Sequence, residues 1–105
     1  MDADDQRQLM MRFSHAVREG NRAIINAMIP EISLDDLAPV IALLARIRGG
    51  YLRQLLEITE GAGEGLPRAE EIEKLSQLRS TYEEMSTATQ ALEVALERGY
   101  LDIKQ

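Results

Sequence analysis

The stretch that decides the fold is 67-PRAEEIEKLSQLRSTYEEMSTATQALEVALER-98, which has no glycine and no proline after its first residue. Its seam side chains recur at alternating steps of three and four residues, the spacing of a coiled coil or helical bundle. These seam residues are Leu75, Leu78, Tyr82, Met85, Thr89, Leu92 and Leu96. At 1.5 Å per residue this helix would be roughly 45 Å long, whereas a domain of about 100 residues has a radius of gyration of about 13 Å. The molecule is therefore either elongated, or a second copy or another partner covers the helix.

A first helix is predicted over about residues 4–29. Acidic residues at its start favour a helix amino end, and an apolar stripe follows on one face. The stripe residues are Leu9, Phe13 and Val17, with Met10 beside them. Gly20-Asn21 leaves two interpretations open, a continuous helix with a weak point or a break into two helices. Pro30 ends the segment in both, because the residue before a proline is pushed out of the α region.

A second helix is predicted over about residues 36–60, and its start depends on Pro39. If Ser33 caps the helix, Pro39 falls at the sixth helical position and removes a backbone donor. If Asp36 caps it, the proline falls in the first turn, where no donor is missed. We therefore expect Asp36 to be the cap.

The second helix is apolar around more of its circumference than its neighbours. Its main stripe is Val40, Leu44, Ile47, Tyr51, Leu55 and Ile58, widened by Ile41, Leu43, Leu52 and Leu56. A helix of this kind is typically central in a bundle or faces a partner. Gly49-Gly50 interrupts it, which marks a kink or a place where another helix crosses closely.

The segment 61–66 is predicted to be a flexible loop. Gly61 suits the left-handed position after a helix, and Pro67 suits the first position of the next one. At the other end of the third helix, Gly99 is the expected left-handed residue and Tyr100 the residue that contacts the last turn. The short apolar tail that begins at Tyr100 is expected to dock.

Together these elements predict an all-α fold for residues 1–105, a single helical domain. The expected architecture is an antiparallel three-helix bundle, or four helices if the first is broken near Gly20-Asn21. The helices are expected at about 4–29, 36–60 and 67–98. Apolar residues make up 45% of the chain, which is enough for a core.

Composition argues against several classes of function. The net charge is −6 without a basic run, so nucleic acid and anionic membrane surfaces are not expected partners. The chain has no cysteine, which excludes disulfides and thiolate chemistry. No apolar stretch is long enough for a membrane span, and the acidic start does not resemble a secretory signal. We expect a cytoplasmic protein.

No residue pattern indicates catalysis, a metal or a cofactor. His15 is the only histidine and lies off the apolar stripe, where a general base would lack an orienting partner. The carboxylates are either adjacent in sequence, so that they diverge by about 100° on a helix, or lie on ordinary solvated faces. Glycine-rich phosphate loops and metal-ligand spacings are absent. We therefore predict that the chain is not an enzyme and binds no cofactor.

The local cluster 46-RIRGGYLR-53 contains three arginines and a tyrosine around two glycines. Guanidinium groups bind carboxylates and phosphates well. Arg46 and Arg53 lie one heptad apart. Three explanations stay open: ion pairs with the acidic third helix or another subunit, recognition of an acidic protein partner, or binding of phosphate.

The surplus of apolar helical surface favours a protein–protein interaction module, such as a small adaptor, an anti-activator or a regulatory subunit. We expect its partner to be another protein, including a second copy in a homo-oligomer. The residues expected to bind are Leu75, Leu78, Tyr82, Met85, Leu92, Leu96, Arg46 and Arg53. The apolar flank of the second helix is expected to contribute to the same binding surface. Thr89 occupies a seam position where a polar residue often sets register or partner number.

An alternative hypothesis is a cytoplasmic chaperone that shields an amphipathic segment of an exported cargo protein. Small acidic helical proteins with a long terminal helix are similar in size and character to flagellar and type III export chaperones. The resemblance lies in composition and helix layout. It implies a cargo protein as the partner.

Overall fold

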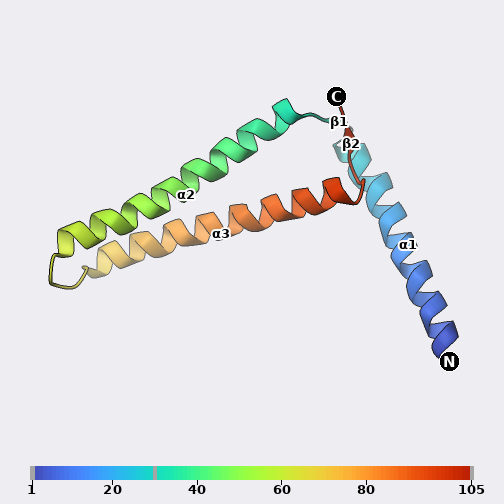
Figure 1. Cartoon of the computed structure of the whole chain (residues 1–105), viewed down its shortest axis with the longest axis horizontal. Coiled ribbons are helices and arrows are strands. Elements are labelled where there is room, and N and C mark those ends of the chain that lie inside the picture. The colour runs from blue at the N-terminus through green and yellow to red at the C-terminus, as the bar shows by residue number, and fades with distance from the viewer. Residues whose placement is uncertain (1, 30, 105) are drawn as a thin grey trace. The chain divides into compact units, whose positions relative to one another are not determined.

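The computed structural model describes residues 2–29 and 31–104, and its long elements are all helices (Figure 1). The elements in chain order are α1 (Ala3–Met28), β1 (Glu31–Ile32), α2 (Leu34–Ala62), α3 (Ala69–Glu97) and β2 (Asp102–Ile103). The all-α class is confirmed, and the two-residue strands were not predicted. The chain divides into two compact units, one of residues up to 34 together with residues from 92 onward, the other of residues 35–91.

Helix α1 is continuous, so the predicted alternative of a break at Gly20-Asn21 is wrong. It begins after Asp2, whose carboxylate accepts a hydrogen bond of 2.9 Å from the backbone N–H of Asp5. Ile29 follows the helix with φ −134° and ψ 80°, as expected for a residue before proline. Pro30 itself lies outside the described residues.

Helix α2 begins at Leu34, so the prediction that Asp36 caps it is wrong. Ser33 stands immediately before the first helical residue, the position that serine favours. Pro39 consequently lies inside the helix, where it lacks the N–H that would bond to the carbonyl of Asp35. A good helix start therefore outweighs one missing hydrogen bond near the amino end.

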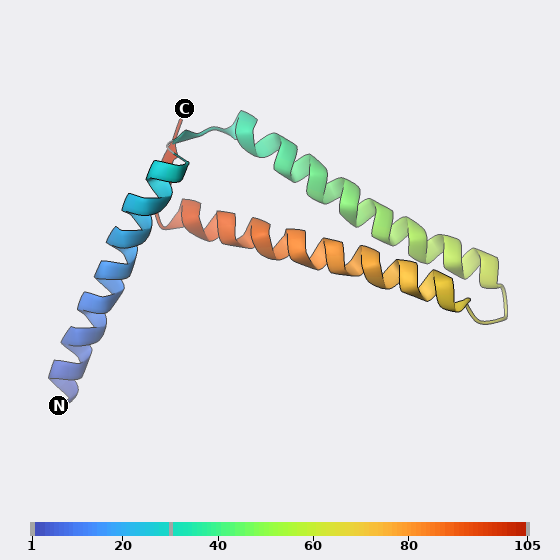
Figure 2. The same cartoon turned by 180° about the vertical axis from the view of Figure 1, so that it is seen from behind.

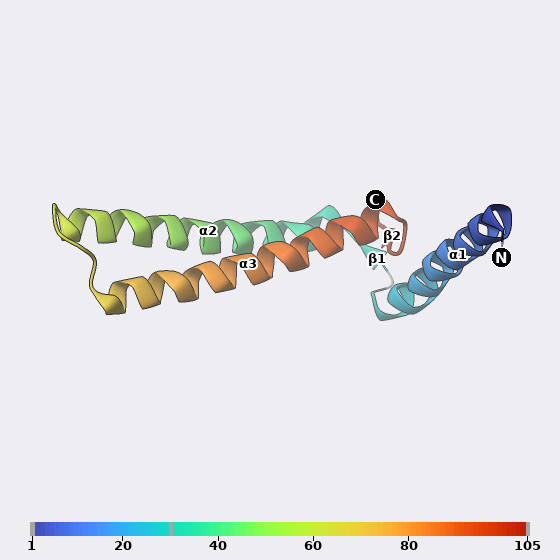
Figure 3. The ribbon, with the colours of Figure 1, turned by 90° about the horizontal axis from the view of Figure 1, so that it is seen from below.

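Helices α2 and α3 form an antiparallel hairpin within the unit of residues 35–91 (Figures 1, 2 and 3). The predicted seam of α3 is confirmed as its half-buried face, because every seam residue is less exposed than its charged neighbours. The facing seam of α2 keeps the same three–four spacing. It consists of Leu37, Val40, Leu44, Ile47, Tyr51, Gln54 and Ile58.

The α2 seam corrects one predicted core position. Leu55 was placed in the stripe, but its side chain is 45% exposed. Gln54 is 9% exposed and Ile58 is 4% exposed. The three–four spacing of the seam therefore includes the polar residue Gln54. A pattern built from apolar residues alone does not include this position.

Gly49-Gly50 lies within the uninterrupted helix α2. A Cβ atom added at either position would meet nothing within 4 Å. The alternative that another helix of the chain crosses closely at this pair is therefore wrong. The two glycines leave open space on the surface of α2.

The turn between α2 and α3 begins later than predicted. Helix α2 runs to Ala62 and includes Gly61, so the prediction of a left-handed Gly61 is wrong. Gly63 takes that role, with φ +57°. The predicted loop 61–66 is thus displaced toward higher numbers by about two residues.

Helix α3 begins at Ala69, after Pro67 and Arg68, so Pro67 is not its first residue as predicted. The backbone N–H of Arg68 donates a 3.0 Å hydrogen bond to the Glu71 carboxylate, which is the reciprocal half of a capping box. This bond is the main reason that the pKa of Glu71 lies below its usual value, with the Arg68 side chain adding to it.

The carboxyl end of α3 is capped as predicted. Gly99 has φ +72°. Its N–H donates to the carbonyl of Leu96 at 3.2 Å, and the N–H of Tyr100 donates to the carbonyl of Ala95 at 2.9 Å. This pair of bonds is the Schellman motif, and it satisfies two carbonyls that the helix leaves unpaired.

The tail after α3 docks, as predicted. Tyr100 and Leu101 are each 4% exposed. Strand β2 then pairs in parallel with β1, with Glu31 opposite Asp102 and Ile32 opposite Ile103. This pairing joins the two ends of the unit that contains α1.

Arg22 of α1 also binds the tail. Its guanidinium donates a 3.0 Å hydrogen bond to the carbonyl of Gly99 and lies 3.6 Å from the carboxylate of Asp102. Both partners are about half exposed, so the ion pair itself contributes little. The contacts place the last two turns of α1 beside the residues that follow α3.

The expected three-helix bundle is wrong, because α1 contributes no buried side chain. Its residues 3–20 are all exposed, and only Asn21, Ile25 and Asn26 are half-buried. Packing between long helices is confined to α2 and α3. The expectation assumed that the apolar stripe of α1 had to be covered within one chain. None of the described helices combines the length and apolarity that a membrane span requires.

Candidate interaction surfaces

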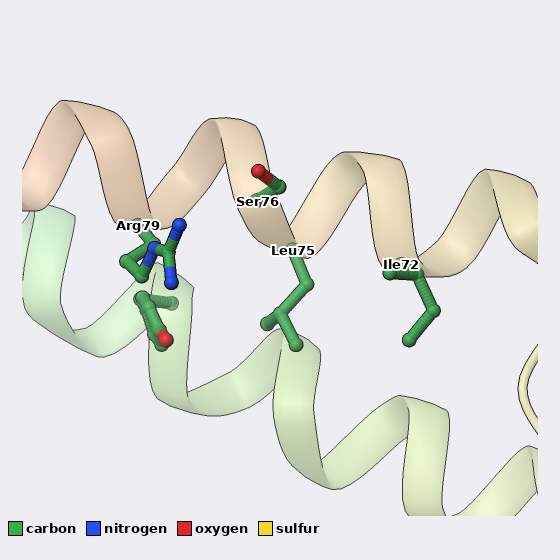
Figure 4. Close-up of a pocket in the computed structure, with 5 residues that line it drawn as sticks. Ile72, Leu75, Ser76 and Arg79 are labelled. Carbon is green, nitrogen blue, oxygen red and sulfur yellow. The ribbon is translucent and has the colours of Figure 1, made fainter.

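The predicted binding residues of α3 lie on the inner face of the hairpin. Leu75, Leu78, Tyr82 and Met85 are half-buried against α2, and Leu92 and Leu96 are half-buried farther along the helix. Figure 4 shows Leu75 and Ile72 pointing from α3 toward α2. They border an open cavity of about 270 Å³ together with Tyr51, Ser76 and Arg79. Their role in binding a partner stays a prediction, and the structure gives them a role inside the hairpin.

A polar cluster joins the middle of the two hairpin helices. The Arg48 guanidinium donates a 3.1 Å hydrogen bond to the Tyr82 hydroxyl and lies 5.3 Å from the centre of that ring. The rings of Tyr51 and Tyr82 meet edge to face at 6.2 Å. The pKa of Tyr82 is lowered by the nearby Ser86 hydroxyl first and by Arg48 second. The Ser86 oxygen is nevertheless buried without a well-formed hydrogen bond to any described residue.

The structure separates the predicted arginine cluster into different roles. Arg48 reaches Tyr82 on α3 rather than a carboxylate. Arg53 lies 3.7 Å from Glu57 one turn further along α2. Arg46 is exposed. The prediction of an intramolecular ion pair is confirmed for Arg53, although its partner lies on α2 and not on α3. Arg46 and Arg53 stay exposed on α2.

One uncovered apolar surface lies along α1, and we call it the α1 face. It consists of Leu9, Met10, Phe13, Val17, Ile24 and Met28. Phe13 is 61% exposed, Ile24 65% and Met28 76%. At 100° per residue the face spans an arc of about 100°, and it lies inside a wider arc in which the sequence places no charged residue of the helix. A helix with such an arc normally buries it.

The α1 face continues into a hollow beside the residues that follow α3. The hollow has a volume of about 240 Å³ and is lined by Phe13, Ser14, Val17, Arg18, Arg98 and Tyr100. The Tyr100 hydroxyl is buried without a hydrogen bond of good geometry to any residue that the structure describes. Asn21 first and Arg98 second lower its pKa.

A second uncovered surface runs along α2, and we call it the α2 outer face. It consists of Leu34, Ala38, Ile41, Ala45, Gly49, Leu52 and Leu56, all exposed. Its large members are 51–74% exposed. At 100° per residue it lies about 120° around α2 from the seam against α3. This face confirms the expectation that α2 is apolar beyond a single stripe.

Sequence reasoning placed the binding surface on the seam of α3 and on the apolar flank of α2, and it did not single out α1. On α3 the large exposed apolar residues are Ile72 and Val94, at 49% and 40%, whereas α1 and α2 carry two continuous faces. The signals were present in the sequence as the uncharged arc of α1 and the second stripe of α2. The stripe of α1 was interpreted as a surface for packing inside one bundle, whereas the second stripe of α2 was also interpreted as a surface that faces a partner.

The described residues contain no group of three or more histidine, cysteine, aspartate or glutamate side chains arranged to hold a metal ion. His15 lies exposed on α1, near Arg18 and Met11 on the helix surface. Comparison of the chain with protein-family models, curated proteins and solved structures finds no match. Function must therefore be argued from the surfaces themselves.

Proposed function

We propose that this chain is a non-enzymatic protein-interaction module whose α1 face binds another protein. The observation that carries the proposal is the exposure of Phe13, Ile24 and Met28 on one uncharged arc. Burying a large apolar side chain contributes about 1.5–3 kcal/mol. Soluble monomers rarely leave a continuous apolar patch uncovered without a use for it.

The spacing of the α1 face fits recognition of a helix by a groove. Leu9, Phe13 and Val17 follow each other at steps of four residues, as the anchors of a groove-bound helix do. At about 100° per residue, Arg7 borders the face on one side, and Asp5 borders it on the other with Arg12 just beyond. The complementary partner is a protein with an apolar groove.

An adaptor or regulatory subunit would use this face on a folded partner. A chaperone of exported cargo would use the same face on an amphipathic segment, and that hypothesis stays the alternative. Self-association in a homo-oligomer was expected through the α3 seam. Because that seam is half-buried within the hairpin, another face must serve for it.

The experiment compares two variants of the full chain as baits in lysate of the cell that makes it. Leu9 is 54% exposed on the α1 face, and His15 is exposed on the opposite side of α1. Both Leu9→Glu and His15→Glu add one negative charge to an exposed helical position. We expect Leu9→Glu to lose the protein that the wild-type chain captures, while His15→Glu retains it and both keep the wild-type helix content.

The proposal fails if the two variants capture the same proteins in the same amounts. It also fails if both lose the partner, because the effect would then follow charge rather than the α1 face. Mass spectrometry of the captured protein separates the two forms of the proposal. A folded subunit indicates an adaptor, and an export substrate indicates a chaperone.

A further inference from the structure

We propose that the α2 outer face binds a second copy of this chain, with the two α2 helices antiparallel about a two-fold axis at Ala45. The inference rests on the proposed function, a protein that binds through apolar helical faces, and it deepens it by naming one partner and its geometry. The dimer would form through α2, whereas the partner protein would bind α1, so an experiment can disprove either proposal without the other.

The spacing of the α2 outer face is the same in both directions from Ala45. Its members lie four, seven and eleven residues before Ala45 and four, seven and eleven residues after it. A two-fold axis requires a self-complementary surface in which residue i meets residue j and j meets i. An antiparallel pair of α2 helices meets that condition along the whole face.

The sizes of the side chains match across this axis. Ile41 of one copy lies opposite Gly49 of the other, and Leu52 lies opposite Ala38. Ala45 meets itself at the centre, where two helices can approach closely. A Cβ at Gly49 would meet nothing within 4 Å, so the space that Ile41 needs is open in the single chain. Large side chains therefore enter holes between small ones, as in helix pairs that pack knobs into holes.

The charges near the face also fit. Arg48 is the charged residue nearest the α2 outer face, and its guanidinium is held by Tyr82 toward α3. On the other border, Asp35 of one copy lies within about two residues of the height of Arg53 of the second copy, on the same side of the pair. Two such pairs form across the axis, and opposite charges at these positions favour the antiparallel register. Glu57 lies 3.7 Å from Arg53 in the same helix and is as near in height to Asp35 of the other copy, so these pairs contribute little and the register rests on the spacing and sizes of the apolar side chains.

One like-charge contact accompanies this arrangement. Arg46 lies one residue from the axis, so the two Arg46 side chains meet. Like charges across an interface weaken association. Arg46→Gln should therefore strengthen the dimer several-fold at low salt, with a smaller gain at high salt where the repulsion is screened. An unchanged or weaker dimer would contradict the register.

Cysteine cross-linking tests the geometry directly, because the chain contains no cysteine. Ala45→Cys places two thiols on the axis and should give a disulfide-linked dimer under mild oxidation. Ala38→Cys places them about 21 Å apart at 1.5 Å per residue, beyond the reach of a disulfide, and should stay unlinked. Linkage of both variants would indicate a parallel pair, and linkage of neither would mean that the two α2 helices do not meet. Either result overturns the proposal.

Light scattering of two charge variants tests the same face without cross-linking. Ala45→Glu places two carboxylates against each other and should halve the measured mass. Ala91→Glu makes the same change on the exposed side of α3 and should leave the dimer intact. A dimer that survives Ala45→Glu overturns the proposal. Because Leu9→Glu leaves α2 untouched, loss of the partner on α1 and loss of this dimer are distinguishable.

Discussion

Helix α3 ends through a single residue with left-handed backbone, Gly99. Its φ of +72° costs most L-residues about 1–2 kcal/mol. A Cβ there would meet only an Arg22 nitrogen at 3.7 Å, an ordinary contact, so the cost is one of backbone conformation. We expect Gly99→Ala to lower the free energy of unfolding in urea by about that amount.

A matched glycine in a helix should respond in the opposite way. Gly20 lies within α1, with open space around its Cβ position, and alanine favours a helix interior over glycine by about 1 kcal/mol. Gly20→Ala should raise stability. Equal effects of the two substitutions would show that Gly99 does not need its left-handed conformation.

The Glu71 carboxylate ties stability to acid pH at the start of α3. Its pKa is lowered chiefly by the backbone N–H of Arg68, so the folded state prefers the charged form. This stabilisation is present above the ordinary pKa of a glutamate and is lost as the pH falls through the lowered value. Compared with Glu71→Gln, the wild-type chain should melt higher at pH 7, and the gap should narrow and close as the pH falls below the ordinary pKa of a glutamate and through the lowered value. A gap that does not depend on pH would rule out the charged cap.

At the scale of the helices, the seam of α2 makes a quantitative prediction. Ile58 is 4% exposed and Leu55 is 45% exposed. Ile58→Ala should cost about 2–4 kcal/mol of stability, and Leu55→Ala well under half as much, because only the first leaves a cavity. Denaturant titration of the two variants checks this. Similar losses would restore the stripe through Leu55 that the sequence predicted.

The two seams show why one helix was predicted better than the other. On α3 the apolar positions stand alone among charged and hydroxyl residues, so their spacing fixes the buried face. On α2 apolar residues surround the helix, so the spacing allows several faces, and Gln54 conceals the true one. The start of α2 was misplaced because Pro39 was weighed more heavily than the favourable residue at Ser33.

At the scale of the whole molecule, the sequence predicted three long helices but not how they pack. An apolar stripe indicates that a surface will be covered, and it does not say whether the cover comes from the same chain. The pairing of β1 with β2 joins segments about seventy residues apart through two residues each, too few to leave a periodic signal. Arg22, in the last turns of α1, contacts the tail that follows α3, and residues 3–20 keep their exposed face.

If a partner protein covers the α1 face, site-specific photo-crosslinking in the native cell will capture that partner. A benzophenone amino acid replaces Leu9 on the α1 face in one variant and His15 on the opposite side in another. We expect a crosslinked adduct of one defined mass from position 9 and none from position 15. Absence of an adduct at position 9, or the same adducts from both positions, would contradict it.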